Sequence, residues 1–330
     1  MLQRPAIHSG RWLMGSSPWR FSFRRDSILK AYNATPRWQW ISSWLELERC
    51  NEFCRCTTAL LTRVCEGASK ESIMTRRWDD LRRETPSEWE GLAMRERSLL
   101  SVRYEYFQSV IFDTLHLNPH GKSILHIGGR RGLFAEVLAR RGWRVTIIES
   151  SEAALAFAKK QTGQEELAID YDRGSAEHLP YADASFDIVY CSDTLEVTKN
   201  LDGVIAEASR VLKKGGAFLY DTVHRTILSR LVYLFVFQRW SWTNIMPPHR
   251  YDQSRLVAPP NLKRIMHAHG LANQECVAFK PRSLSQLIGA VRAYKRGSIN
   301  ADEAGERVQM KMAKRGEKPA VTYLGFGLKQ

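Results

Sequence analysis

The feature that most constrains the fold is the run from Ile124 to Glu149, ILHIGGRRGLFAEVLARRGWRVTIIE. It contains an apolar stretch, a glycine turn, a segment with helical spacing, a second apolar stretch and an acid, in that order. Because glycine has no Cβ, such a turn lets the backbone approach a ligand closely. An acid at the end of the second strand can accept hydrogen bonds from two ribose hydroxyls. The run therefore predicts a strand–helix–strand unit that binds its ligand through Gly128 and Glu149.

The remaining pattern alternates strands with helices. Strands are expected at 123–127, 144–148, 168–171, 188–191, 217–223 and 321–328, and helices at 98–117, 133–141, 152–161, 201–212 and 262–269. This alternation predicts a mainly parallel sheet covered on both faces, with ligands beyond the carboxyl ends of the strands. A dinucleotide site is disfavoured, because Arg130 and Leu133 stand where the pattern Gly-x-Gly-x-x-Gly needs glycine.

Three further motifs follow in a fixed order: Gly174-Ser-Ala-Glu-His-Leu-Pro, Ser185-Phe-Asp-Ile-Val, and Arg210-Val-Leu-Lys-Lys-Gly-Gly. Together with the glycine turn, they resemble a class I S-adenosylmethionine methyltransferase over residues 95–330 in outline. The resemblance implies a Rossmann-like α/β fold, with a mainly parallel seven-stranded sheet and helices on both faces. It also implies S-adenosyl-L-methionine as the cofactor.

Segments outside these motifs resemble the ubiquinone biosynthesis O-methyltransferases. They are Leu99–Phe107 before the first strand, Asp221–Leu231 after the fifth, Ile245–Asp252, and Val321–Lys329 at the end. Those enzymes methylate catechol-type hydroxyls on polyprenylated rings. The resemblance thus implies an O-methyltransferase acting on a hydroxylated aromatic ring, a polyprenylated ubiquinone precursor. Two alternatives stay open: an O-methyltransferase of secondary metabolism, and a non-catalytic methyltransferase-like scaffold at a membrane.

The resemblance assigns four cofactor-binding residues. Arg103 matches the arginine that holds the methionine carboxylate, and Gly128 matches the first glycine of the turn. Glu149 takes the place of the family's ribose-binding aspartate, and Ser192 matches a residue whose backbone faces the cofactor.

The glycine turn departs from the family pattern Asp-x-Gly-Cys-Gly-x-Gly. His126 stands for the acid, and Arg130 stands for the middle glycine. The arginine adds a Cβ and a positive charge close to the cofactor's sulfonium and ammonium groups, and it can help only by meeting the carboxylate. His126 is expected to pack under the turn.

A second departure concerns a metal. The family has Glu-x-x-Glu-His after the fourth strand, whereas this chain has Asp193-Thr-Leu-Glu196-Val197. Asp193 and Glu196 share one face of a helical turn and are candidate ligands for Mg²⁺, which prefers oxygen. Two ordinary acids at a helix entry are an equal alternative.

Removal of the acceptor's proton needs a base, and two histidines are candidates. His224 follows the fifth strand on the expected ligand side, and His249 lies near Asp252. An exposed loop histidine is the alternative for both.

The segment 227–245, ILSRLVYLFVFQRWSWTNI, is apolar and aromatic with interspersed arginines. It is too short and too charged to span a bilayer, which favours peripheral membrane contact with Trp240 and Trp242 at the headgroup level. A buried lid helix is the alternative. The expected partner is a small-molecule or lipid-tailed aromatic substrate. Nucleic acid is not expected despite the net charge of +14, because the basic residues form no aromatic-interleaved patch.

The first 73 residues have a different composition from the rest. Five arginines precede the first acid, Asp26, as in a mitochondrial transit peptide. The expected organisation is a basic leader or disordered extension at 1–73 and a methyltransferase domain at 74–330, with a membrane- or lid-type insertion near 227–252. The expected localisation is mitochondrial and associated with the inner membrane; cytoplasmic is the alternative.

Overall fold

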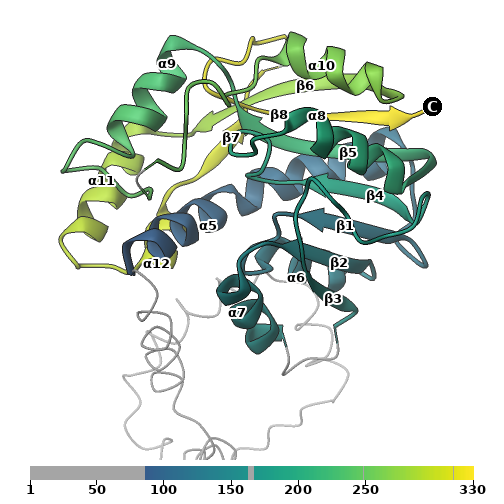
Figure 1. Ribbon diagram of the computed structural model, residues 1–330. Helices are drawn as coiled ribbons and strands as arrows, with labels where there is room; N and C mark the ends of the chain where they lie inside the picture. The colour runs from purple at the N-terminus through teal and green to yellow at the C-terminus, as the bar shows by residue number, and fades with distance from the viewer. Residues whose placement is uncertain (1–85, 163–166, 248, 315) are drawn as a thin grey trace, which may run out of the picture. The chain divides into compact units, whose positions relative to one another are not determined.

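The computed structural model describes residues 86–162, 167–247, 249–314 and 316–330. The expected leader at 1–73 therefore lies outside the described residues. The described part contains one eight-stranded sheet with the strand order β3-β2-β1-β4-β5-β8-β6-β7 (Figure 1). Helices cover both faces of this sheet, so the predicted α/β class is confirmed.

Five strands form the parallel half of the sheet. They are β1 (Ser123–Ile127), β2 (Arg144–Glu149), β3 (Ile169–Arg173), β4 (Phe186–Cys191) and β5 (Leu212–Val223). β1 pairs with β2 on one side and with β4 on the other, and Ile127 lies level with Ile148 and Cys191. The carboxyl ends of these three strands therefore lie side by side, and the strand order reverses between β1 and β4. Ligands of open α/β sheets bind beyond the carboxyl ends at such a reversal.

The antiparallel half differs from the prediction. The last strand, β8 (Thr322–Lys329), lies between β5 and β6 (Leu271–Pro281), and β7 (Met310–Met312) adds an outer strand. The prediction of seven strands was therefore short by one. β6 was missed as well, because its polar run Asn273–Glu275 contains a register shift and hides the apolar alternation.

The helices are α5 (Pro86–Gln108), α6 (Leu133–Ala139), α7 (Glu152–Thr162), α8 (Leu201–Val211), α9 (Ile227–Ser229), α10 (Pro259–Ala268), α11 (Leu284–Lys295) and α12 (Ala301–Arg307). Two wider, π-helical turns continue α5 and α9, namely η2 (Ser109–Thr114) and η3 (Arg230–Val236). The helix expected at 98–117 therefore starts earlier and ends in a π turn.

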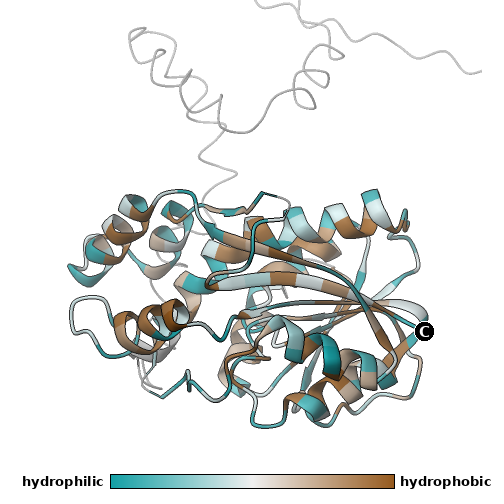
Figure 2. Cartoon of the chain, turned by 90° about the horizontal axis from the view of Figure 1, so that it is seen from above, coloured by the Kyte–Doolittle hydropathy of each residue, from teal (hydrophilic) through white to brown (hydrophobic). Residues whose placement is uncertain are grey.

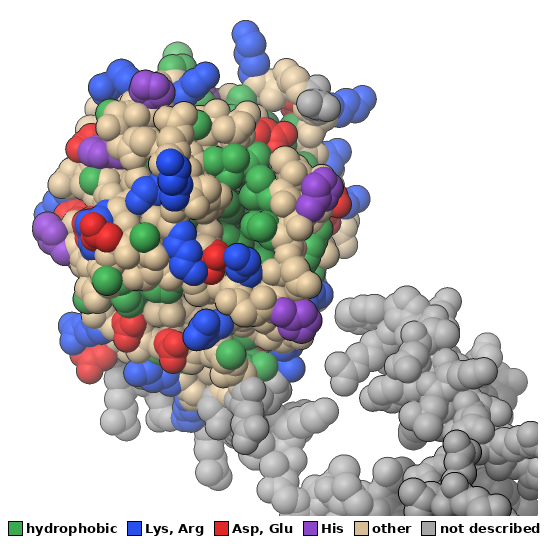
Figure 3. All heavy atoms as spheres, turned by 90° about the vertical axis from the view of Figure 1, so that its right-hand side faces the viewer, with side chains coloured by type: hydrophobic (Ala, Val, Ile, Leu, Met, Phe, Trp, Pro, Cys, Tyr) green, Lys and Arg blue, Asp and Glu red, His purple; other side chains and the backbone are tan. Residues whose placement is uncertain are grey.

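Apolar side chains fill both faces of the sheet. Ile124, Ile147 and Ile188 pack under α5 and α6 on one face, and Leu125, Val189 and Phe218 pack with α8 and α10 on the other. Figure 2 shows apolar colour along the strands and polar colour on the outer sides of the helices. On the face seen in Figure 3, basic and acidic side chains are interspersed around an apolar area.

Candidate functional site

The glycine turn is held against the loop after β4. Gly128 has φ 73°, and its N–H donates to the carbonyl of Ile148 at 3.0 Å. A Cβ on Gly128 would lie 2.3 Å from Thr194 Oγ1 and 2.5 Å from the Ser192 carbonyl oxygen. Two loops therefore touch through backbone here, and a side chain has no room.

His126 supports this turn from beneath, as predicted. Its ring is buried, and Nε2 lies 2.8 Å from Ser192 Oγ, which donates onward to the Gly128 carbonyl at 3.2 Å. Because the hydroxyl donates to Gly128, it accepts from His126, which assigns the proton to Nε2. Burial and the charge of Arg103 lower the pKa of His126 to about 3, so the ring is neutral.

Glu149 ends β2 with its carboxylate fixed by backbone amides. Oε2 accepts from the Arg130 N–H at 3.2 Å, and Oε1 accepts from the Ser151 N–H at 3.0 Å. These bonds orient the carboxylate beside the turn. Each oxygen retains lone pairs for a hydroxyl of a ligand.

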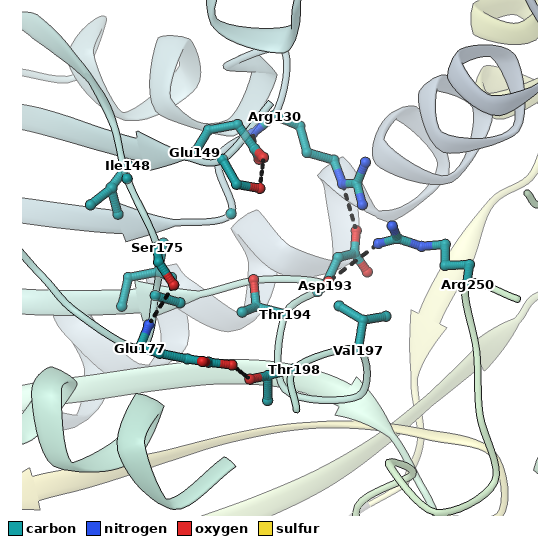
Figure 4. Close-up of a pocket in the computed structure, with 15 residues that line it drawn as sticks. Arg130, Ile148, Glu149, Ser175, Glu177, Asp193, Thr194, Val197, Thr198 and Arg250 are labelled. Atoms are coloured by element: carbon teal, nitrogen blue, oxygen red, sulfur yellow. Dashed lines mark hydrogen bonds and ion pairs between the residues drawn. The ribbon is translucent and has the colours of Figure 1, made fainter. Parts of the chain in front are cut away.

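A cavity of about 210 Å³ opens between these loops. Its walls come from the turn after β1, the ends of β2 and β3, the loop after β4, and Arg250 of the loop before α10. The lining residues are Ile127, Gly128, Arg130, Ile148, Glu149, Ser150, Gly174–Glu177, Asp193, Thr194, Val197, Thr198 and Arg250. In Figure 4, Glu177 lies at one end, Glu149 lies between, and Arg130 and Arg250 lie at the other end. The sequence thus placed Gly128 and Glu149 correctly at one cavity, although their contact with a cofactor stays a prediction.

Glu177 was missed by the sequence assignment, although its motif was recognised. It follows β3 in the Gly174-Ser-Ala-Glu segment, and its carboxylate accepts from Thr198 Oγ1. That hydrogen bond lowers the pKa of Glu177, so the group is a carboxylate at neutral pH.

Two of the predicted cofactor residues do not line this cavity. Ser192 is buried, and its hydroxyl serves the turn. Arg103, on α5, is 3% exposed and forms a fork with Asp221, with Nε and Nη2 at 3.0 and 2.7 Å from its oxygens. Arg103 Nη2 also lies 2.9 Å from Asp193 Oδ2. Its guanidinium is therefore already held by two carboxylates of the chain.

Arg95 completes this buried network and had no sequence signal. Its Nε donates to Asp193 Oδ1 at 2.7 Å, and Nη1 donates to the hydroxyl of Tyr233 at 2.7 Å. Burial raises the pKa of Asp193, but the charges of Arg103 and Arg95 outweigh it and hold that pKa well below its usual range. Burial and the charge of Asp193 raise the pKa of nearby Glu196 to about 7.

The candidate metal ligands do not fit a divalent cation. Both oxygens of Asp193 are bound by guanidiniums, and Arg95 Nη2 lies 3.6 Å from Glu196 Oε1. A cation between Asp193 and Glu196 would be next to Arg95 without the family's histidine, whose place Val197 takes. Within residues 86–330 as described, no group of three or more His, Cys, Asp or Glu is placed to hold a metal. The structure gives Mg²⁺ no support.

Neither candidate base lines the first cavity. His224 is half-buried, its pKa is lowered by burial, and its ring meets Tyr323 edge-on at 5.9 Å. His249 is exposed and lines a second cavity of about 500 Å³, with Arg230, Leu234, Gln238, Arg239 and Tyr251–Gln253. The loop that holds Arg250 in the first cavity therefore holds His249 and Tyr251 in the second.

The segment 227–245 lies on the surface with apolar side chains in solvent. Ile227 is 84% exposed and Trp242 is 73% exposed, and Leu228, Leu231, Phe235 and Trp240 are also exposed. Its inner side is anchored by buried Tyr233, whose ring lies 5.3 Å from the guanidinium carbon of Arg95. The described helices include none that is long and apolar enough to cross a membrane.

Comparison with known proteins shows which families this chain resembles. Residues 125–220 match the methyltransferase domain family. The ubiquinone biosynthesis O-methyltransferase of Azoarcus sp. (strain BH72) is 32% identical over 158 residues, which cover 47% of this chain and 66% of that protein, just under two thirds of its length. The enzyme of the same name from Nitrosococcus oceani is 28% identical over 223 residues, covering 67% of this chain and 87% of the relative.

A solved structure described as a sarcosine dimethylglycine methyltransferase from Galdieria sulphuraria covers 70% of this chain and 86% of its own, with 16% identity and a TM-score of 0.49. We draw no conclusion about function from this structural similarity. Residues 125–220 form a methyltransferase domain, as the family match and the sheet order agree. These matches confirm the predicted resemblance to class I methyltransferases and to the ubiquinone biosynthesis O-methyltransferases.

Proposed function

We propose that this chain is an S-adenosylmethionine-dependent O-methyltransferase whose acceptor is a hydroxylated aromatic ring, a polyprenylated precursor of ubiquinone. The observation that carries the proposal is the cavity beyond β1, β2 and β4, whose wall joins Gly128 to the fixed carboxylate of Glu149. The names of the bacterial relatives support the choice of ring.

S-adenosylmethionine supplies the methyl group when it is bound, and the chain's residues orient the partners. Glu149 accepts hydrogen bonds from ribose hydroxyls, and the turn at Gly128 lets the backbone come close. Methyl transfer is an in-line displacement, so most of the rate comes from holding the acceptor oxygen in line.

The second cavity is the proposed acceptor site. It lies on the other side of the loop that carries Arg250, and His249 faces it. We propose that His249 takes the proton from the acceptor hydroxyl as the oxygen attacks. His224 remains the other candidate base. Since both oxygens of Asp193 are bound by guanidiniums and Arg95 Nη2 lies 3.6 Å from Glu196 Oε1, we expect transfer without magnesium.

The test measures labelled methyl transfer from S-adenosylmethionine to a polyprenyl catechol by the purified full chain. We expect transfer with and without a chelator of divalent cations, and a loss of at least about 100-fold in Glu149→Ala. Glu152→Ala is the matched control, because Glu152 is an exposed acid three residues away. We expect His249→Ala to lower transfer by about 100-fold with cofactor affinity unchanged.

Folded protein that binds the cofactor but methylates no catechol would refute the acceptor. Preference for a catechol without a prenyl tail would favour secondary metabolism.

Membrane contact through 227–245 is the finer part of the proposal. The exposed Ile227, Phe235, Trp240 and Trp242, flanked by Arg225 and Arg239, suit the interface of a bilayer, where a polyprenyl tail resides. Vesicle co-sedimentation tests it. The double variant Trp240→Ser/Trp242→Ser should bind vesicles about tenfold more weakly, whereas Leu284→Ser, an exposed apolar residue on α11, should bind as the parent does. Equal binding by all three proteins contradicts the proposal.

We further propose that residues 1–73 direct the chain to mitochondria, where it associates with the inner membrane. The five arginines that precede Asp26 support this. Import of the full chain into isolated mitochondria, with removal of the leader, is the expected result. A chain that stays outside the organelle contradicts it.

A further inference from the structure

Four arginines converge on Asp193 in the loop after β4, and they differ in whether a carboxylate neutralises their charge. Arg95 and Arg103 are buried and bound by Asp193 and Asp221 at hydrogen-bond distance. The two positive charges of these guanidiniums are therefore neutralised by the two negative charges of the carboxylates. Glu196 can keep its proton because this neutralisation needs no third negative charge.

The charges of Arg130 and Arg250 are not neutralised in this way. Arg130 Nε lies 4.0 Å from Asp193 Oδ2, at the outer limit of an ion pair. Arg250 Nη2 donates to the Asp193 carbonyl at 3.3 Å, while its Nε is buried and has no hydrogen-bond partner among the described residues. Both side chains line the first cavity, and Figure 4 shows them reaching toward Asp193 from two sides.

We infer that Arg130 and Arg250 together hold the α-carboxylate of the cofactor, in the role that the family resemblance gives to Arg103. This inference rests on the proposed function, because it concerns the same cofactor. Arg103 cannot take that role without weakening its ion pair with Asp193 or with the buried carboxylate of Asp221. Arg103 is instead a positioning residue that fixes Asp193 at the cavity wall.

The cavity has acidic residues toward one end and basic residues at the other, which matches the arrangement of polar groups along the cofactor. Glu177 and Glu149 lie toward one end, where hydroxyl and amino donors of adenosine suit carboxylates. Arg130 and Arg250 lie at the other end, where the only anion of the cofactor is needed. Burial and the like charge of Arg250 lower the pKa of Arg130, and an anion between the two relieves that repulsion.

The arginine that replaces the family's middle glycine is thereby explained. Arg130 has φ 47°, a left-handed conformation that glycine adopts freely and arginine seldom does. The chain keeps the glycine-like backbone and adds a guanidinium at the anionic end of the ligand.

The test compares two ligands by calorimetry on the full chain. S-adenosylhomocysteine carries the amino-acid carboxylate, and 5′-methylthioadenosine lacks the amino-acid end. The parent protein should prefer the former by about 100-fold. Arg130→Gly and Arg250→Gln should each reduce that preference about tenfold and leave the affinity for 5′-methylthioadenosine within about twofold.

Arg255→Gln is the matched control. Its guanidinium also donates to a carbonyl of the loop after β4, that of Val197 at 3.1 Å, but it does not line the first cavity. It should retain the full preference. Arg130→Gly can fold, because glycine suits the local backbone better than arginine does.

Three results would overturn the inference. If the variants bind both ligands equally more weakly, the two arginines have only a structural role. If both variants keep the full preference, Arg103 is the residue that binds the carboxylate. Failure of the folded parent protein to bind either ligand would refute the inference together with the cofactor site. If the parent protein prefers S-adenosylhomocysteine but transfers no methyl group to a catechol, only the proposed acceptor is refuted.

Discussion

Gly128 occupies a point where two loops meet without space for a methyl group. Gly128→Ala would bring a Cβ within 2.5 Å of the Ser192 carbonyl oxygen, at a φ of 73° that alanine disfavours. We expect a loss of about 2 kcal/mol or more in the free energy of unfolding and loss of S-adenosylhomocysteine binding. Gly289→Ala, at an open position inside α11, should instead stabilise by about 0.5–1 kcal/mol. Urea denaturation measures both, and equal effects would contradict the packing argument.

Glu196 makes stability depend on pH. Burial and the charge of Asp193 raise its pKa from the ordinary value of 4.5 to about 7, so between these pH values the folded state retains a proton that the unfolded state has lost. The resulting stability is complete below pH 4.5 and is lost as the pH rises through about 7. Relative to the parent protein, Glu196→Gln should therefore gain about 3 kcal/mol between pH 4.5 and 8. A difference that stays constant with pH would show that Glu196 is ionised throughout.

Single residues could be predicted where a local pattern determines them. Glu149 ends an apolar strand and Gly128 begins a turn, so adjacent residues were sufficient to place both at the cavity. The partners of Arg103 come from the ends of β4 and β5, far along the chain, and no spacing in one sequence reveals them. Arg95 was missed for the same reason.

At the scale of elements, Arg131 joins the glycine turn to two helices. It donates to Glu96 of α5 at 2.9 Å and to Asp302 of α12 at 2.8 and 3.0 Å. Arg131→Met should cost about 3 kcal/mol, because buried Glu96 loses its cationic partner and keeps only the N–H of Leu133. Arg173→Met removes an exposed pair with Glu152 and should cost less than about 1 kcal/mol. Guanidinium denaturation distinguishes them, and similar losses would refute the assignment.

Elements with an uninterrupted apolar run were the easiest to predict. β1 was placed correctly to the residue, and β2 and β4 within two residues, because strands buried on both faces need apolar residues throughout. α8 was placed within two residues as well, because its apolar residues recur at helical spacing. β6 was missed because its polar bulge breaks the alternation. α11 and α12 were missed as well, although α12 begins with the capping box of Asn300 and Glu303.

At the scale of the whole molecule, the last residues hold the sheet together. β8 pairs with β5 on one side and β6 on the other, and Tyr323, Leu324 and Phe326 are buried. Deletion of residues 322–330 should abolish cooperative thermal unfolding, because β6 would lose its link to the parallel half. Deletion of Gln330 alone should leave the transition within a few degrees of the parent protein, because this residue is exposed and follows the strand. A normal transition in the longer deletion would contradict this account.

The position of β8 also sets the order of events during synthesis. A ribosome releases β1 to β5 long before β8, and these strands can pair while the chain is still growing. The edge of β5 then stays unpaired, since its neighbour β8 follows β6 and β7 along the chain. A nascent chain of this protein therefore exposes the unpaired edge of β5 until β8 has left the ribosome, and we expect chaperones to protect it mainly in that interval.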